Sequence, residues 1–217
     1  ANNMNKERIL SAIKAQGIIA VVRGKNAEHA INVAEACIEG GVTCIELTFT
    51  TPHAHEAIRT LSQKYADDPT VIIGAGTVLD AITARIAILE GAQFIVSPAF
   101  DAETIKLCHR YQIAVMPGTT TLSGVIEAME AGADIIKIFP GELAGPAMIR
   151  AIHGPLPQAV LMPTGGVTPD NAGAWLNAGC IAVGAGGSLT KGADNNDFAA
   201  VTEQAKKFVQ AITAART

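Results

Sequence analysis

The chain has 217 residues, of which 49% are apolar, 17% charged and 4% aromatic, with 21 Gly and 10 Pro. Such a chain can bury a substantial core, which excludes a disordered protein, a collagen and a small disulfide-stapled scaffold. Sixteen Lys and Arg against 20 Asp and Glu give a net charge of −4. This sign is wrong for a protein whose main partner is nucleic acid or an anionic membrane, so we expect a small-molecule ligand.

The cysteines and the first helix favour a cytoplasmic protein. The four cysteines are scattered singly with no C-x-x-C pair, which indicates neither a zinc site nor a disulfide framework. Residues 1–17 carry charges where a signal peptide would be continuously apolar, and they predict a short amphipathic helix. Residues 171–190 have no charge, but their five glycines and two asparagines make the segment too polar to span a bilayer.

Short apolar runs recur along the chain, and the segments between them repeat apolar residues at helical spacing. The runs begin at Ile18, Val42, Thr70, Gln93, Ile113, Ala133, Ala159 and Ile181. A weak repeat (EGGVTCIEL, EGAQFIVSP, EAGADIIKI, NAGCIAVGA) places a glycine before four of them. We predict an α/β fold over residues 1–217: a single (β/α)8 TIM barrel domain with an extra N-terminal helix. A doubly wound open sheet is the alternative.

The sixth predicted strand carries a lysine inside an apolar run. The alternation of a strand puts Ile135, Lys137 and Phe139 on one face, so we expect Lys137 to be enclosed. Burial lowers the pKa of a lysine and makes a neutral amine available near pH 7. Such an amine can attack a ketone to form a Schiff base, an electron sink for breaking a C–C bond. The alternative is a structural lysine that pairs with a carboxylate or reaches the solvent.

Two further charged residues belong to the first and second predicted strands. Glu46 shares a strand face with Cys44 and Thr48, which we expect to point into the barrel. A Schiff-base enzyme needs an acid–base group beside its lysine, and Glu46 fits this role, although a simple ion pair with Lys137 or Arg23 is equally compatible. Arg23 ends the first strand, where it could hold a carboxylate or phosphate, or form a surface salt bridge.

Glycine-rich turns follow the last two predicted strands, PTGG at residues 163–166 and GAGGS at residues 184–188. In (β/α)8 enzymes a phosphate often lies between these two loops, where missing side chains let backbone N–H groups approach. Ser188 would add a hydroxyl donor. The alternative is that the glycines only serve tight turns.

No metal or cofactor is predicted. His53 and His55 are two residues apart at the start of a helix, a spacing that does not place both on one helical face, so we expect no metal pair there. Glu46 stands alone among the strands, without the clustered ligands that a metal-dependent aldolase requires. The chain has no G-x-S-x-G and no G-x-x-x-x-G-K-[ST], which leaves a serine hydrolase and a P-loop nucleotide hydrolase unsupported.

Eight motifs carry a family resemblance. In chain order they are VVRG, IELTFTTP, GAGTV, SPAF, MPGTTT, IKIFPGE, MPTGGV and GAGGSL, over residues 18–189. Together they resemble the family of 2-keto-3-deoxy-6-phosphogluconate (KDPG) and 4-hydroxy-2-oxoglutarate (KHG) aldolases. The resemblance implies a class I, metal-free lyase of the Entner–Doudoroff type that cleaves KDPG to pyruvate and glyceraldehyde 3-phosphate. It also implies KHG as a second candidate substrate, cleaved to pyruvate and glyoxylate, and a homotrimeric assembly.

The resemblance also implies site residues. Lys137 matches the Schiff-base lysine and Glu46 the acid–base glutamate. The matching substrate contacts are Arg23, Thr77 for pyruvate, Pro98 and Phe139 as apolar walls, and Gly165, Gly166, Gly187 and Ser188 on the phosphate side. Some family members have an arginine where this chain has Thr50, and that arginine helps to hold the pyruvate carboxylate. Here we expect Arg23, Thr77 and backbone N–H groups to do so.

Other functions stay open at this point. The sequence does not fix the stereochemical preference at C4, so a 2-dehydro-3-deoxy-6-phosphogalactonate aldolase is one alternative. A phosphosugar isomerase-like barrel, in which Lys137 only pairs with an anion, is another. A non-catalytic small-molecule binding subunit is the third. For the main reading the expected partners are a keto acid and a phosphorylated aldehyde.

Overall fold

The computed structural model describes residues 5–217, in which short strands alternate with helices. The strands are β1 (Ile18–Val22), β2 (Cys44–Thr48), β3 (Ile72–Gly76), β4 (Phe94–Val96), β5 (Ala114–Met116), β6 (Gly118–Thr119), β7 (Ile136–Ile138), β8 (Leu161–Pro163) and β9 (Val183–Ala185). The helices are α1 (Lys6–Gln16), α2 (Ala27–Glu39), α3 (Ala54–Lys64), α4 (Ala81–Leu89), α5 (Ala102–Arg110), α6 (Leu122–Glu130), α7 (Gly141–His153), α8 (Ala172–Asn177), α9 (Gly187–Thr190), the 3-10 helix η1 (Lys191–Asn195) and α10 (Phe198–Ala215).

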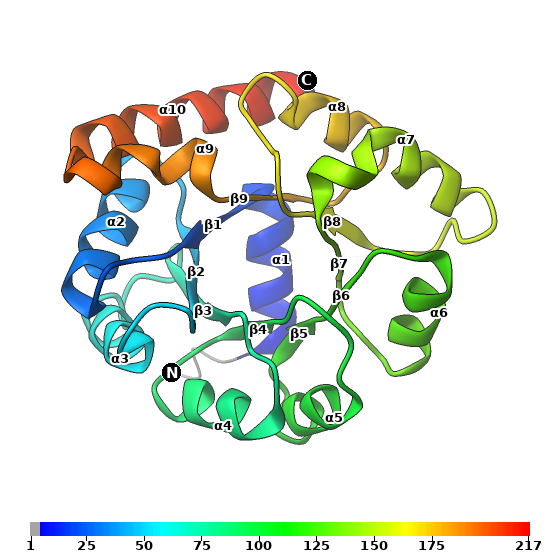
Figure 1. Cartoon of the computed structure of the whole chain (residues 1–217), viewed down its shortest axis with the longest axis horizontal. Coiled ribbons are helices and arrows are strands. Elements are labelled where there is room, and N and C mark those ends of the chain that lie inside the picture. Colours follow the sequence, from blue (N-terminus) through cyan, green and yellow to red (C-terminus); the bar gives the residue numbers. More distant parts are fainter. Residues whose placement is uncertain (1–4) are drawn as a thin grey trace.

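The strands form two parallel sheets. Six strands pair in the order β5-β4-β3-β2-β1-β9, and three pair in the order β6-β7-β8. The longer sheet is curled, with α2 to α5 outside it and α1 in the centre of the view (Figure 1). Each of the eight predicted runs contains a strand, and the fifth contains both β5 and β6, which Pro117 separates. The parallel α/β architecture expected from the sequence is therefore confirmed. Among residues 5–217, no helix combines the length and apolar character that a membrane crossing needs.

Side chains at the helix ends explain where the helices begin and end. The residue before the helix accepts a hydrogen bond from a backbone N–H of the first turn at Asn5, Asn26, Asp80, Asp101, Thr121 and Asp197. The glycines of the internal repeat have positive φ just after α2, α4, α6 and α8, at Gly41, Gly91, Gly132 and Gly179. Only glycine adopts this conformation without strain, so the repeat marks the turns from helix to strand.

The inner strand face is apolar at the amino ends of the strands, and α1 covers this part. Ile9 and Ile13 of α1 are fully buried in one cluster with Ile19, Ile72 and Phe94 from the first half of the strands. Two polar contacts hold the helix in place. Lys6 pairs with Asp134 at 2.9 Å, and the Arg216 guanidinium donates to the carbonyls of Lys14 and Ala15 at 2.8 and 2.9 Å.

This packing predicts a measurable contribution of α1 to stability. Replacing Ile13 with alanine should lower the free energy of unfolding by about 2–5 kcal/mol, because it leaves a cavity in a closed cluster. Urea denaturation followed by circular dichroism measures the change. Lys14→Ala, an exposed neighbour on the same helix, should change the free energy by less than about 0.5 kcal/mol. Equal effects of the two substitutions would show that α1 is not packed as described.

Candidate active site

A cavity of about 350 Å³ opens where β1, β2, β3, β7, β8 and β9 end. Its walls comprise Val21, Arg23, Glu46, Thr77, Lys137, Phe139, Glu142, residues 164–168 and residues 186–188. All the sequence-predicted site residues line it except Pro98, whose carbonyl lies next to Gly118. The structure thus brings together, from distant parts of the chain, the residues that the motifs singled out.

Lys137 is the central residue of β7 and is 5% exposed. Its strand neighbours Ile136 and Ile138 pack in the core cluster shared with the outer helices, as the alternation predicts, so the lysine faces the cavity. Its Nζ lies 4.6 Å from the centroid of the Phe139 ring. Burial lowers the pKa of Lys137; the Glu46 carboxylate raises it in part, and Arg23 lowers it further. The environment therefore favours the neutral amine.

Glu46 belongs to β2 and is 1% exposed. Burial raises the pKa of its carboxyl group, while the charges of Lys137 and Arg23 lower it by smaller amounts. Within residues 5–217, no direct ion pair of 4.0 Å or less joins Glu46 to Lys137. The two groups interact electrostatically, and both line the cavity.

The position of Glu46 depends on a glycine in the next strand. Gly76 ends β3 and pairs with Thr48 of β2, and a Cβ at this position would overlap with the Glu46 carboxylate. We expect Gly76→Ala to displace the carboxylate and to lower kcat by about 100-fold, the usual effect of a 1 Å misplacement.

A steady-state assay of the aldol cleavage that the family resemblance implies measures this effect. Gly173→Ala is the matched control, because a Cβ there meets only Ala215 at ordinary contact distance. A Gly76→Ala protein with full activity would show that the Glu46 position is not critical.

Thr77 and Arg23 also line the cavity. Thr77 follows β3 with φ of 53°, a left-handed conformation that is strained for a β-branched residue and costs of order 1–3 kcal/mol. Such strain is concentrated at functional sites. Arg23 is exposed at the end of β1, and the next residue, Gly24, donates its N–H to the buried Thr51 hydroxyl at 2.9 Å. Thr51 thereby fixes the loop that carries Arg23 to the end of β2.

The two glycine loops lie side by side in the cavity wall. Gly165 and Gly166 both have positive φ, 105° and 70°. The Ser188 hydroxyl donates to the carbonyl of Val167 and so links the loops, whereas its role as a phosphate donor stays a prediction. A Cβ at Gly187 would meet nothing within 4 Å, so this backbone is open to a ligand.

Six residues that line the cavity were not singled out as site residues from the sequence: Val21, Glu142, Thr164, Val167, Thr168 and Gly186. The Glu142 carboxylate lies beside Gly165, and the buried Thr164 forms a parallel bridge with Gly184. Glu142 belongs to the motif IKIFPGE and Thr164 to the motif MPTGGV. Because both follow directly after predicted strands, their positions could have identified them as residues of the cavity wall. Thr50 is exposed, shares a 2.7 Å hydrogen bond with Thr48, and is not part of the cavity wall.

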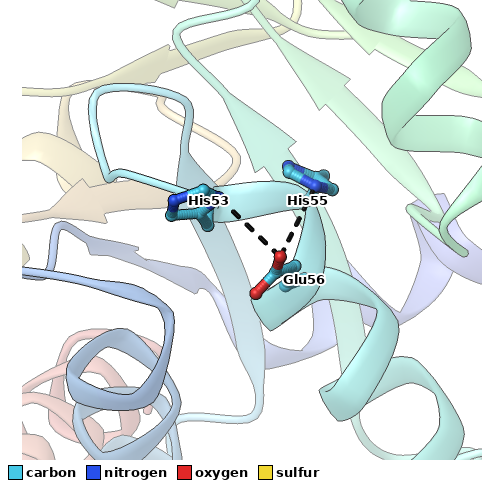
Figure 2. Close-up of side chains that lie close together, drawn as sticks. All are labelled: His53, His55 and Glu56. Atoms are coloured by element: carbon cyan, nitrogen blue, oxygen red, sulfur yellow. Dashed lines mark ion pairs between the residues drawn. The ribbon is translucent and has the colours of Figure 1, made fainter.

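His53 and His55, for which the spacing predicts no shared helical face and no metal pair, lie close together in the structure. Nitrogen atoms of both rings and a carboxylate oxygen of Glu56 lie within 4.8 Å of one another (Figure 2). The helical-face argument was wrong because His53 precedes α3 and has a left-handed backbone with φ of 58°.

The fold and the cavity define an α/β protein with a desolvated lysine and a carboxyl group in one polar cavity at the carboxyl ends of parallel strands. The chain belongs to the KDPG and KHG aldolase family, because the model of that family matches residues 9–204.

Relatives agree with this assignment. The 2-dehydro-3-deoxy-phosphogluconate aldolase of Treponema pallidum (strain Nichols) is 35% identical, over 94% of this chain and 97% of its own. The 2-dehydro-3-deoxy-6-phosphogalactonate aldolase of Escherichia coli (strain K12) is 34% identical, over 89% of this chain and 93% of its own. The crystal structure of Legionella pneumophila KDPG aldolase, with pyruvate captured as a covalent carbinolamine, superposes with a TM-score of 0.83 at 29% identity, over 91% of this chain and 96% of that one.

Proposed function

We propose that this protein is a class I aldolase that cleaves KDPG to pyruvate and glyceraldehyde 3-phosphate. The observation that carries the proposal is the buried Lys137 amine, which shares a cavity with the buried Glu46 carboxyl group in a chain of this family. The names of the relatives and the captured pyruvate in one of them agree with it.

The chemistry follows from the two groups. The neutral Lys137 amine attacks the C2 carbonyl of the substrate to give a carbinolamine, which loses water to form an iminium ion. The C3–C4 bond then breaks, its electron pair moves to the iminium nitrogen, and the C4 hydroxyl loses its proton as the aldehyde leaves. Protonation of the resulting enamine at C3 and hydrolysis release pyruvate and regenerate the amine. We assign the proton transfers to Glu46, because burial raises the pKa of its carboxyl group and so favours the protonated form that can return a proton to the enamine.

The phosphate end of the substrate belongs at the loop of residues 186–188. Gly187 offers open backbone, whereas the Glu142 carboxylate lies beside Gly165 and would repel a phosphate placed there. We propose that Gly166, Gly187 and Ser188 contact the phosphate, that Arg23 and Thr77 hold the pyruvate carboxylate, and that Phe139 forms an apolar wall. Pro98 lies outside the cavity wall, so its contact with substrate is the weakest of the inherited assignments.

We further propose that the two sheets form one (β/α)8 barrel and one domain, in which β5 and β6 count as a single strand. Three contacts support closure. The Asp134 N–H, just before β7, donates to the Val115 carbonyl of β5, the Ile181 N–H donates to the Leu161 carbonyl, and Thr164 bridges to Gly184. These contacts join the short sheet to the long one at both of its edges.

The assembly and location are proposed on other grounds. Leu79, Ile82, Ile86 and Leu89 project from one face of the α4 region and are exposed, Ile82 by 76%. A contiguous apolar face of this kind is typical of an interface, and we propose that other copies of the chain cover it in a homotrimer. Light scattering measures the mass of the assembly, and Ile82→Glu should yield monomers.

The buried, free cysteines fit the cytoplasmic location that we expect.

The decisive assay compares kcat/KM for the phosphogluconate, phosphogalactonate and hydroxy-oxoglutarate substrates. We expect the phosphogluconate substrate to have the highest value. The galactonate epimer is the second candidate, because a relative named for it is nearly as similar as the relative named for the gluconate. No pyruvate release from any of the three would overturn the proposal and favour an isomerase-like barrel or a silent binding subunit.

A further inference from the structure

We propose that His53, His55 and Glu56 form a binding site for a divalent transition-metal ion, with Zn²⁺ as the best fit, outside the cavity described above. The three side chains converge at the start of α3 (Figure 2). His53 Nδ1 lies 3.7 Å from Glu56 Oε1, and His55 Nε2 lies 4.0 Å from the same oxygen. Zinc bonds of about 2.0–2.1 Å in a tetrahedron place neighbouring ligand atoms about 3.3 Å apart, so small side-chain rotations would close the site around an ion.

The ligand set selects the class of metal. Two imidazoles and one carboxylate suit Zn²⁺, Co²⁺, Ni²⁺ and Cu²⁺, whereas Mg²⁺ and Ca²⁺ prefer oxygen ligands alone. Three protein ligands leave a fourth tetrahedral position for water. The side chains of His53, His55 and Glu56 are 68%, 39% and 51% exposed, so an ion reaches them directly from solvent.

Local structure orients the ligands before an ion arrives. The left-handed backbone of His53 turns its ring back toward the first turn of α3, and the Glu56 N–H donates to the His53 carbonyl at 2.9 Å. Arg59, a cation one turn further along the helix, is paired with Glu90 at 2.5 Å. The Glu56 carboxylate therefore stays directed at the two imidazoles.

The thiols and the other imidazoles of residues 5–217 are buried or hydrogen-bonded. The thiols of Cys37, Cys44, Cys108 and Cys180 are buried, and burial raises the pKa of each to about 12, which disfavours the thiolate that a metal requires. In each of the other three histidines, Nε2 lies within hydrogen-bond distance of a backbone carbonyl: His29 with Ala193, His109 with Ala131 and His153 with Ala159. If the folded protein binds one metal ion per chain, we therefore assign that ion to the site at α3.

The site joins α3 to the loop that follows β2, which also contains Thr51, the acceptor for Gly24 next to Arg23. An ion held by His53 before the helix and by His55 and Glu56 within it would fix this loop. We therefore assign the ion a stabilising role, because binding to the folded state alone raises stability. None of its three ligands lines the cavity, so the site is independent of the proposed reaction.

The test titrates tag-free, chelator-treated full-length protein with Zn²⁺ in competition with a chromophoric chelator, and with Co²⁺ followed by absorption spectroscopy. We expect one ion per chain, a tetrahedral Co²⁺ spectrum without a thiolate charge-transfer band, and a Zn²⁺-dependent rise in Tm. His53→Gln, His55→Gln and Glu56→Gln should each weaken Zn²⁺ binding at least about tenfold, given that even indirect ligand contacts are worth 10–100-fold. His109→Gln is the control, since glutamine can still donate to Ala131, and it should bind Zn²⁺ like the unaltered chain.

Three results would overturn the site: no Zn²⁺ binding by the unaltered chain, equal affinity in all three ligand variants, or a thiolate band in the Co²⁺ spectrum. Turnover measured in parallel separates this inference from the proposed function, because loss of the metal site should leave the trapping of pyruvate on Lys137 intact.

Discussion

Replacing Lys137 with alanine is expected to abolish turnover, with kcat falling on the order of 10⁴-fold or more. The amine is the group that we propose to bond to the substrate, and no other residue of the cavity wall is an amine that could replace it at that position. Incubation of the unaltered protein with pyruvate and borohydride should add one three-carbon unit to Lys137, detected by peptide mass spectrometry. Lys137→Ala should show no such addition.

Two controls make this experiment specific. Lys106→Ala removes an exposed lysine of α5 and should leave both turnover and trapping unchanged. Lys137→Arg retains a cation but not a neutral amine, because arginine stays protonated, so it should be as inactive as Lys137→Ala. Trapping on a different lysine, or full turnover in Lys137→Ala, would refute the Schiff-base assignment.

Replacing Glu46 with glutamine is expected to separate covalent capture from proton transfer. Glutamine keeps the shape of the side chain but cannot accept and return a proton, so kcat should fall by about 10²–10⁴-fold. The exchange of the pyruvate methyl protons with deuterium, followed by NMR, should slow by a similar factor. Borohydride trapping of pyruvate on Lys137 should continue.

The pH dependence of trapping gives a second measurement on the same variant. The charged Glu46 carboxylate raises the pKa of Lys137, so removing that charge should lower it further. A lower lysine pKa keeps the amine neutral in more acidic solution, and the acid limb of the trapping rate should therefore move to lower pH in Glu46→Gln. A shift to higher pH, or proton exchange at the normal rate, would contradict the role of Glu46.

Much of the fold could be predicted because apolar residues recur with different periods in strands and in helices. Apolar runs such as IIAVV of β1 are buried on both faces, and a glycine after the helix marks each of four turns back to a strand. The same regularity placed Lys137 and Glu46 on the inner face, since alternation along a strand is fixed by its geometry. The division of the fifth predicted strand into β5 and β6 at Pro117 was not predictable, because it depends on the curvature of the sheet and not on the period of the sequence.

The parts of the site that sequence reasoning missed depend on three-dimensional proximity. Glu142 reaches the cavity because Gly165, from a different loop, has no side chain in its way. The convergence of His53 with His55 depends on a single left-handed residue, which helical spacing does not anticipate. Pro98 shows the opposite error: its motif is present, but its position lies beyond the wall of the cavity.

The N-terminal helix has a consequence for the order of events. Because α1 and its isoleucines cover the amino ends of the strands, the cavity opens at the opposite, carboxyl ends. The amine and the carboxyl group lie at depth, whereas Gly166 and Gly187 lie exposed at the entrance. The aldehyde fragment lies nearer to the opening of the cavity, and the keto-acid fragment lies deeper, at Lys137. With the keto acid bonded to Lys137, as we propose, aldehyde release precedes pyruvate release, and in the synthetic direction the keto acid binds first.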